Sequence, residues 1–167
     1  MTKEYDFLNW TSFPSSLKLT NDGSVKYVNP GLLFNNLATR PGVPLRLELA
    51  GKQQNVTAPL GGYSHFPIWG APQGGEYRYL GSLAMPLGTY DWQPLSRELP
   101  IPADIVMINA TLGGASGTPE NPGITWFDDL KIHQDDVLIY ANDFSNWAPV
   151  IIPAQIITGV AMIKYLK

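Results

Sequence analysis

Few residues of this chain have the chemistry that enzymatic catalysis needs. The sequence has no cysteine and only two histidines, His65 and His133, and it contains no phosphate-binding glycine loop, nucleophile elbow or pair of metal-binding histidines. Four carboxylates are candidates for the acid–base pair of a glycoside hydrolase: Asp91, Glu98, Asp128 and Asp129. Their spacing singles out no two of them. The sequence therefore predicts a protein that is not an enzyme.

Aromatic side chains have the clearest binding chemistry. The flat face of a tyrosine or tryptophan ring stacks on the apolar C–H surface of a pyranose, while polar neighbours bind its hydroxyl groups. Tyr77 and Tyr79, and likewise Tyr90 and Trp92, are two residues apart, so we expect each pair to project from one sheet face. The glycan-binding candidates are Tyr63, Trp69, Tyr77, Tyr79, Tyr90 and Trp92. The alternative is that these rings fill a core or an interface.

The composition predicts one all-β domain. Of the 167 residues only 15% are charged, and 16 glycines and 15 prolines indicate many short strands and turns. A net charge of −3 supplies no basic surface for a phosphate backbone, which argues against nucleic acid as a partner. Residues 1–6 have no apolar run after their positive charge, so we expect no secretory signal. The apolar stretch 150–166 is interrupted by polar residues, so we expect no membrane span.

The stretch 123–132 has the pattern of a half-buried inner strand. Strict alternation places Trp126, Leu130 and Ile132 on one face of this strand. Asp128 falls on the same apolar face. Because an unpaired buried carboxylate is costly, Asp128 must be hydrogen-bonded, paired or bound to a cation.

This stretch resembles the last strand of the jelly-roll carbohydrate-binding modules, whose pattern is apolar, Trp or Tyr, any residue, Asp-Asp, then apolar. Residues 97–103 and 104–112 are similar to the segments that lead into and form the preceding strand of that fold. The resemblance covers the second half of a sandwich domain. It implies an antiparallel two-sheet β-sandwich, a jelly roll, over residues 1–140.

The same resemblance implies a structural calcium ion. Paired aspartates in that family often lie beside such an ion, which prefers oxygen ligands, and Asp128 and Asp129 match them. Asp6 on the first strand would approach from the other side. The alternative is that Asp128 caps backbone N–H groups and Asp129 is solvated.

Turn residues and periodicity predict further elements. The turn signal at 21–24 predicts a hairpin whose returning strand ends at Val28. Leucines alternate with charged residues over 45–49, in a strand that we expect to end at Gly51. Proline, glycine and aromatic residues crowd without periodicity over 55–75, which predicts a long functional or interface-forming loop.

A pentad recurs at the two ends of the chain, as Asp-Phe-Leu-Asn-Trp at 6–10 and Asp-Phe-Ser-Asn-Trp at 143–147. The second copy precedes an apolar tail that would promote aggregation if it were left unpaired. We therefore expect 141–167 to form a C-terminal arm or extra strands that dock on the same chain or on a neighbouring subunit. The expected arm contacts are Phe144, Trp147, Ile151, Ile152, Ile156 and Ile157.

Together these features predict a non-catalytic structural or surface protein. A jelly roll without an export signal fits a virion component, such as a phage capsid decoration or tail protein, that assembles in the host cytoplasm. Its expected partners are further copies of itself or other virion proteins, and host glycans at the virion surface. The alternative is an extracellular carbohydrate-binding module from a secreted glycoside-active enzyme.

Overall fold

Strands make up the regular structure of the described part of the chain. The structure, a computed structural model, describes residues 2–12, 15–145 and 150–151, and contains no helix there that is long and apolar enough to span a membrane. The strands are β1 (Thr2–Asp6), β2 (Ser16–Asn21), β3 (Tyr27–Val28), β4 (Leu32–Ala38), β5 (Leu45–Val56), β6 (His65–Ala71), β7 (Arg78–Ala84), β8 (Gly88–Leu99), β9 (Met107–Thr111), β10 (Gly114–Ala115), β11 (Gly123–Gln134), β12 (Val137–Asn142) and β13 (Val150–Ile151).

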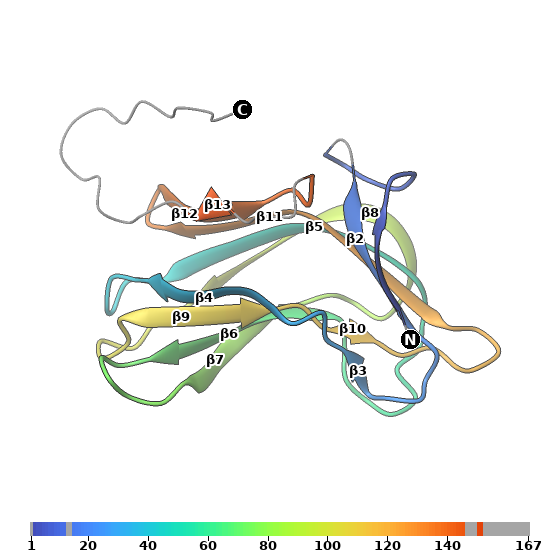
Figure 1. Cartoon of the computed structure of the whole chain (residues 1–167), viewed down its shortest axis with the longest axis horizontal. Helices are drawn as coiled ribbons and strands as arrows, with labels where there is room; N and C mark the ends of the chain where they lie inside the picture. The colour runs from blue at the N-terminus through green and yellow to red at the C-terminus, as the bar shows by residue number, and fades with distance from the viewer. Residues whose placement is uncertain (1, 13–14, 146–149, 152–167) are drawn as a thin grey trace.

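Two antiparallel sheets lie over one another, as Figure 1 shows. The large sheet contains β1, β2, β11, β12 and β13, and β5 and β8 extend it on the other side of β11. The small sheet has the order β4-β9-β6-β7, and β3 and β10 form a short ribbon near its end. This arrangement confirms the predicted all-β sandwich.

Strand β11 is the inner strand that the sequence predicts. One of its sides pairs with β5 along most of its length. Its other side pairs with β2 over residues 123–127 and then with β12 over residues 130–134. A single strand therefore joins the two halves of the large sheet.

Strand β11 changes partner at a β-bulge. Asp129 has φ +49°, and the pairing with β5 skips from Asp128 to Lys131. The extra residue shifts the alternation, so Phe127, and not Trp126, points into the core with the apolar residues that follow the bulge. The predicted common face of Trp126, Leu130 and Ile132 is therefore wrong.

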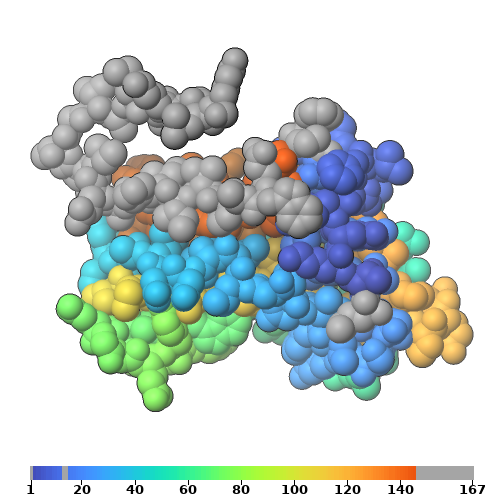
Figure 2. All heavy atoms as spheres, viewed as in Figure 1, coloured from blue at the N-terminus to red at the C-terminus, as the bar shows by residue number. Residues whose placement is uncertain are grey.

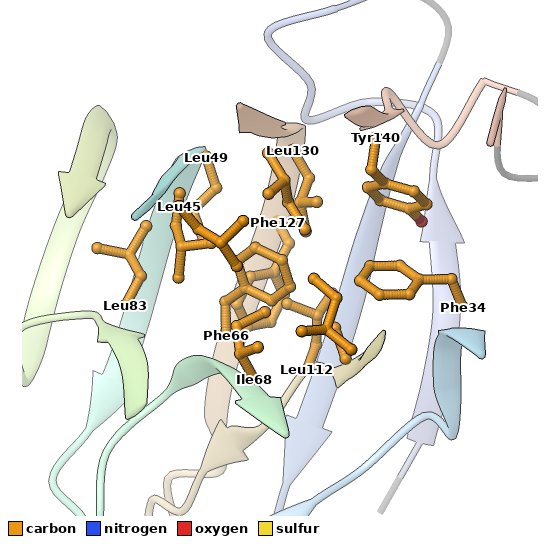
Figure 3. Packing of buried hydrophobic residues seen from close by; sticks show 14 of the residues in the cluster. Phe34, Leu45, Leu49, Phe66, Ile68, Leu83, Leu112, Phe127, Leu130 and Tyr140 are labelled. Carbon is orange, nitrogen blue, oxygen red and sulfur yellow. The ribbon is translucent and has the colours of Figure 1, made fainter. Parts of the chain in front are cut away.

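Side chains from both sheets meet in one core, shown in Figure 3. Phe127 from the large sheet lies among residues such as Phe66 and Ile68 of β6, and all three are fully buried. Burying such a side chain contributes roughly 1.5–3 kcal/mol. Leu45 and Leu47 of β5 are also fully buried, as their alternation with charged residues predicts.

The predicted end of β5 is wrong, because the strand continues through Gly51 to Val56. Gly51 lies in the strand interior, where an added Cβ would be 2.4 Å from Cε of Met85. The missing side chain of Gly51 thus leaves room for Met85, and the glycine does not mark a turn.

The predicted hairpin over residues 16–28 is also wrong. Both edges of β2 are occupied, by β1 and by β11, so β3 pairs with β10 instead. The side chain of Asn21 ties the intervening turn down by donating to the backbone oxygens of Val25 and Gly114.

The stretch 55–75, predicted to be a loop, contains the central strand β6. Phe66 and Ile68 alternate towards the core there, but the glycines and prolines around them hide the pattern. Pro67 lies inside the strand. On the side of β6 that faces β9, His65 pairs with Gly113 and Ile68 pairs with Ala110. Pro67 lies between them and has no pairing partner on this side, where its missing N–H is therefore not needed.

The two pentads share a local turn but differ in burial. Asp6 accepts the N–H of Leu8, and Asp143 accepts the N–H of Ser145 in the same way. Phe7 is 64% exposed, whereas Phe144 is 4% exposed and packs in the core of its own chain. Of the other expected arm contacts, Ile151 lies in β13, where side chains are not described. The remaining ones lie outside the described residues: Trp147, Ile152, Ile156 and Ile157.

The left-handed backbone at the bulge predicts that glycine is tolerated better than valine at position 129. At φ +49° a β-branched side chain is strained, whereas glycine is not, and both replacements lose the same carboxylate. We expect Asp129→Val to unfold at a free energy about 1–2 kcal/mol lower than Asp129→Gly in urea titrations. Equal stabilities of the two variants would mean that Asp129 has ordinary strand geometry.

Candidate functional site

Four side chains form a line across the outer face of the small sheet. Phe66 and Ile68 point into the core, so Trp69 on the same strand points outwards. Trp69 pairs with Asn109 of β9 on one side and with Tyr79 of β7 on the other. The backbone N–H of Asn36 on β4 donates to Oδ1 of Asn109 at 2.8 Å. We call Asn36, Asn109, Trp69 and Tyr79 the cross-strand row.

The aromatic end of the row, in which Trp69 is half-buried and Tyr79 is exposed, is fixed in place. The rings of Trp69 and Tyr79 meet edge to face, with centroids 6.1 Å apart and an interplanar angle of 63°. Tyr79 is 55% exposed, and its hydroxyl donates to Oγ of Ser82 at 3.1 Å. The sheet therefore presents ring surface to solvent in a defined orientation.

The amide end of the row depends on a second irregular residue. Asn36 has φ +57°, a left-handed conformation that asparagine tolerates, where the pairing of β4 with β9 is interrupted. The hydroxyl of Tyr77 donates to Oδ1 of Asn36 at 2.5 Å, and desolvation raises the pKa of Tyr77 above its ordinary value. Tyr77 immediately precedes β7, in the green segment that protrudes at the lower left of Figure 2.

The row combines two kinds of contact. Exposed rings offer apolar faces, and neighbouring amides offer hydrogen bonds. Because the four residues come from four adjacent strands, their spacing is set by the strand separation of about 4.8 Å. Such a surface suits a ligand with a flat C–H face and several hydroxyl groups.

The other predicted platform residues lie elsewhere. Tyr63 lies before β6 and contacts His65. Tyr90 packs against the core, its hydroxyl has no hydrogen-bond partner among the described residues, and burial raises its pKa to about 12. Trp92 is half-buried on β8, where a shift in the pairing with β5 breaks the alternation with Tyr90. The structure thus brings together Trp69, Tyr77 and Tyr79 of the predicted set.

Sequence reasoning missed Asn36 and Asn109. Asn109 lies between the core residues Ile108 and Ala110, so alternation alone would have placed it on the outer face. Which residues lie beside Asn109 in the row could not be found in that way, because this depends on the register between strands.

The predicted calcium ligands are engaged in hydrogen bonds. Asp128 is fully buried, and its carboxylate accepts backbone N–H groups of Thr11 at 2.7 Å, Ser12 at 2.8 Å and Asp129 at 2.8 Å. The hydroxyl of Ser12 also donates to Asp128, and the single proton of the Thr11 hydroxyl is shared between Asp128 and Asp129, whose oxygens are both 3.0 Å away.

This donor set does not fit a cation, because N–H groups point at the oxygens that a cation would need. Within residues 2–12, 15–145 and 150–151, no three acidic, histidine or cysteine side chains group so as to hold a metal. The geometry matches the alternative interpretation, in which Asp128 caps backbone N–H groups. Calcium binding stays a prediction.

Asp6 supports the outer side of β11 through Trp126. Its Oδ2 accepts the indole N–H of Trp126 at 2.8 Å, and Lys18 and Lys52 lie over the same ring at 5.9 and 5.6 Å from its centroid. Desolvation raises the pKa of Asp6, but hydrogen bonds from Trp126, Leu8 and Asn9 outweigh it and leave the pKa below its ordinary value. This cluster is structural and lies on the large sheet, away from the row.

Comparisons with known proteins identify the fold. No family model and no curated protein matches the chain. The solved structure "Family 16 Carbohydrate Binding Module-2" has a TM-score of 0.56 at 12% identity, over 79% of this chain and 85% of that one. The enzymatically active domain of tailspike protein 4 of bacteriophage CBA120 has a TM-score of 0.52 at 15% identity, over 80% of this chain and 17% of that one. The chain thus has the β-sandwich fold of a carbohydrate-binding module.

Asp6 predicts a pH-dependent contribution to stability. Because its pKa is lower in the folded chain than the ordinary 3.8, it stabilises the fold above that value, and this contribution is lost as the pH falls through the lower folded pKa. We expect Asp6→Asn to lower the unfolding free energy by about 1 kcal/mol at pH 7. In urea titrations at decreasing pH, the difference from the unmodified chain should shrink once the pH falls below about 4. A difference that stays constant down to pH 3 would contradict this role.

Proposed function

We propose that this protein binds glycans through the cross-strand row on the outer face of the small sheet. The observation that carries the proposal is the placement of a half-buried ring, Trp69, and an exposed ring, Tyr79, in line with two amides, Asn36 and Asn109. A sugar has apolar C–H surfaces, which the rings can contact, and hydroxyl groups, which the amides can bind. Both kinds of side chain lie on one sheet face.

One amide of the row is oriented to donate. The backbone N–H of Asn36 can only donate, and Oδ1 of Asn109 accepts it, which fixes the oxygen of the Asn109 amide and leaves its NH₂ group as the donor for a ligand. The Asn36 amide is hydrogen-bonded to the Tyr77 hydroxyl. Hydroxyl oxygens of a sugar would accept the Asn109 donor, while its C–H face lies on Trp69.

The likeness of fold supports a binding role, and the chemistry of the described residues supports a non-catalytic one. The similar structure is named for carbohydrate binding. Within the described part of the chain, the carboxylates Asp6 and Asp128 accept several hydrogen bonds from their surroundings, as structural groups do. Binding without turnover is therefore the function that the geometry supports best.

The similarity to part of a phage tailspike chain suggests a more specific setting for this proposal. In this setting the protein is a virion surface component that assembles with further copies or with other virion proteins and attaches to host glycans. An extracellular module that accompanies a glycoside-active enzyme would use the same surface. Association through the apolar segment after β13 distinguishes the two settings.

Removing ring surface should weaken binding. We expect Trp69→Ala and Tyr79→Ala each to weaken binding about tenfold or more, measured by affinity electrophoresis in gels that contain soluble polysaccharides. Phe7→Ala is the matched control, because Phe7 is 64% exposed and lies on the large-sheet side of the sandwich. Equal migration of all three variants and the unmodified chain in every polysaccharide gel would refute the proposed site.

Removing residues 152–167 tests the assembly setting. If this apolar segment mediates association, the intact chain is an oligomer and the shortened chain a monomer, as measured by light scattering after size-exclusion chromatography. An intact chain that is already monomeric, or a shortened chain of unchanged subunit number, would contradict assembly through this segment.

A further inference from the structure

A second group of rings lies at the other end of β6. His65, the first residue of β6, contacts Tyr27 of β3 with ring centroids 5.2 Å apart, and Tyr63 with centroids 5.0 Å apart. Tyr63 is 38% exposed, and its ring meets His65 edge to face at 73°. We call Tyr27, Tyr63 and His65 the ring cluster.

The ring cluster and the cross-strand row share one face of the small sheet. Phe66 and Ile68 point into the core, so His65 and Trp69 both point outwards. They are four residue steps apart along the extended strand, which is about 13 Å. Between them on this face, Pro67 and its partner Ser82 on β7 are buried, so neither projects a long side chain between the two ring groups.

Two glycines make room for the ring cluster. An added Cβ at Gly62 would be 2.6 Å from Cε1 of Tyr27, and one at Gly113 would be 2.7 Å from Nε2 of His65. His65 also exchanges both backbone hydrogen bonds with Gly113, at 2.8 and 2.9 Å. The rings are therefore held in place by the backbone around them, as the rings of a preformed binding surface are.

The His65 part of the cluster suits neutral ligands, while the ammonium of Lys26 lies over the ring of Tyr27, 5.4 Å from its centroid. Burial lowers the pKa of His65 below its ordinary value, so the imidazole is uncharged at neutral pH. Tyr63 then presents an aromatic ring to solvent with a neutral ring against it. This surface can stack on the C–H face of a sugar in the same way as Trp69 and Tyr79.

We propose that the ring cluster is a second glycan subsite, and that the ligand is an extended polysaccharide chain which contacts both the ring cluster and the cross-strand row. The inference rests on the proposed glycan binding. A monosaccharide is shorter than the separation of the two groups and can occupy only one of them. A chain of several sugars gains contacts at both, and its affinity rises with its length.

The test is a length series measured by titration calorimetry with cello-, xylo- and manno-oligosaccharides, from disaccharide to hexasaccharide. We expect the affinity of the unmodified chain to rise when the oligosaccharide becomes long enough to span both groups. Tyr63→Ala should lower the affinity for the long oligosaccharides about tenfold and leave that for the short ones unchanged. Trp69→Ala should lower the affinity for both, and Phe7→Ala should change neither.

The outcomes separate the inference from the proposed function. If Tyr63→Ala binds every length like the unmodified chain while Trp69→Ala does not, the second subsite is refuted and glycan binding at the row stands. An equal loss at all lengths in Tyr63→Ala also refutes a separate subsite. If the unmodified chain binds no member of the three series, both the inference and the proposed function fail. A melting temperature of Tyr63→Ala equal to that of the unmodified chain excludes misfolding as the cause of a loss.

Discussion

The large sheet depends on the hydrogen bonds that the buried carboxylate of Asp128 accepts. Asp128 lies where β11 exchanges β2 for β12 as its partner, and it is fully buried. The N–H and hydroxyl groups of Thr11 and Ser12 surround it, so the loop after β1 is fastened to the middle of the sheet. Leaving these donors and the charge unsatisfied would cost several kcal/mol. The bulge, the loop and the strand exchange therefore all depend on the same hydrogen bonds.

The small sheet is organised for a different purpose. Its inner face supplies core residues such as Phe66 and Ile68, while its outer face holds rings and amides in contact with one another. Because strand register sets these positions, little ordering entropy is lost when a ligand binds. Both sheets therefore use an irregular residue: Asp129 lies at the strand exchange in the large sheet, and Asn36 lies at the amide end of the row in the small sheet.

Sequence patterns predict the sandwich better than the site. Alternation identifies strands such as 45–49 and the inner strand at 123–132, because burial on one face leaves a period of two. It fails at Asp129, where a left-handed residue shifts every later side chain by one, and at β6, where Pro67 and nearby glycines mask a central strand. The row joins four strands that are distant in sequence, so its two asparagines carry no local signal that links them to Trp69 and Tyr79.

Glycan binding to the outer face of the small sheet is the proposed function on which the second subsite also depends. The most direct measurement is the mapping of backbone and indole N–H resonances during titration with the polysaccharide fragment that binds best. We expect the shifts to concentrate at the indole of Trp69 and at Asn36, Asn109 and Tyr79, and the resonances of the large sheet to stay unchanged. Shifts confined to the large sheet, or centred on the loop that contains Phe7, would contradict it.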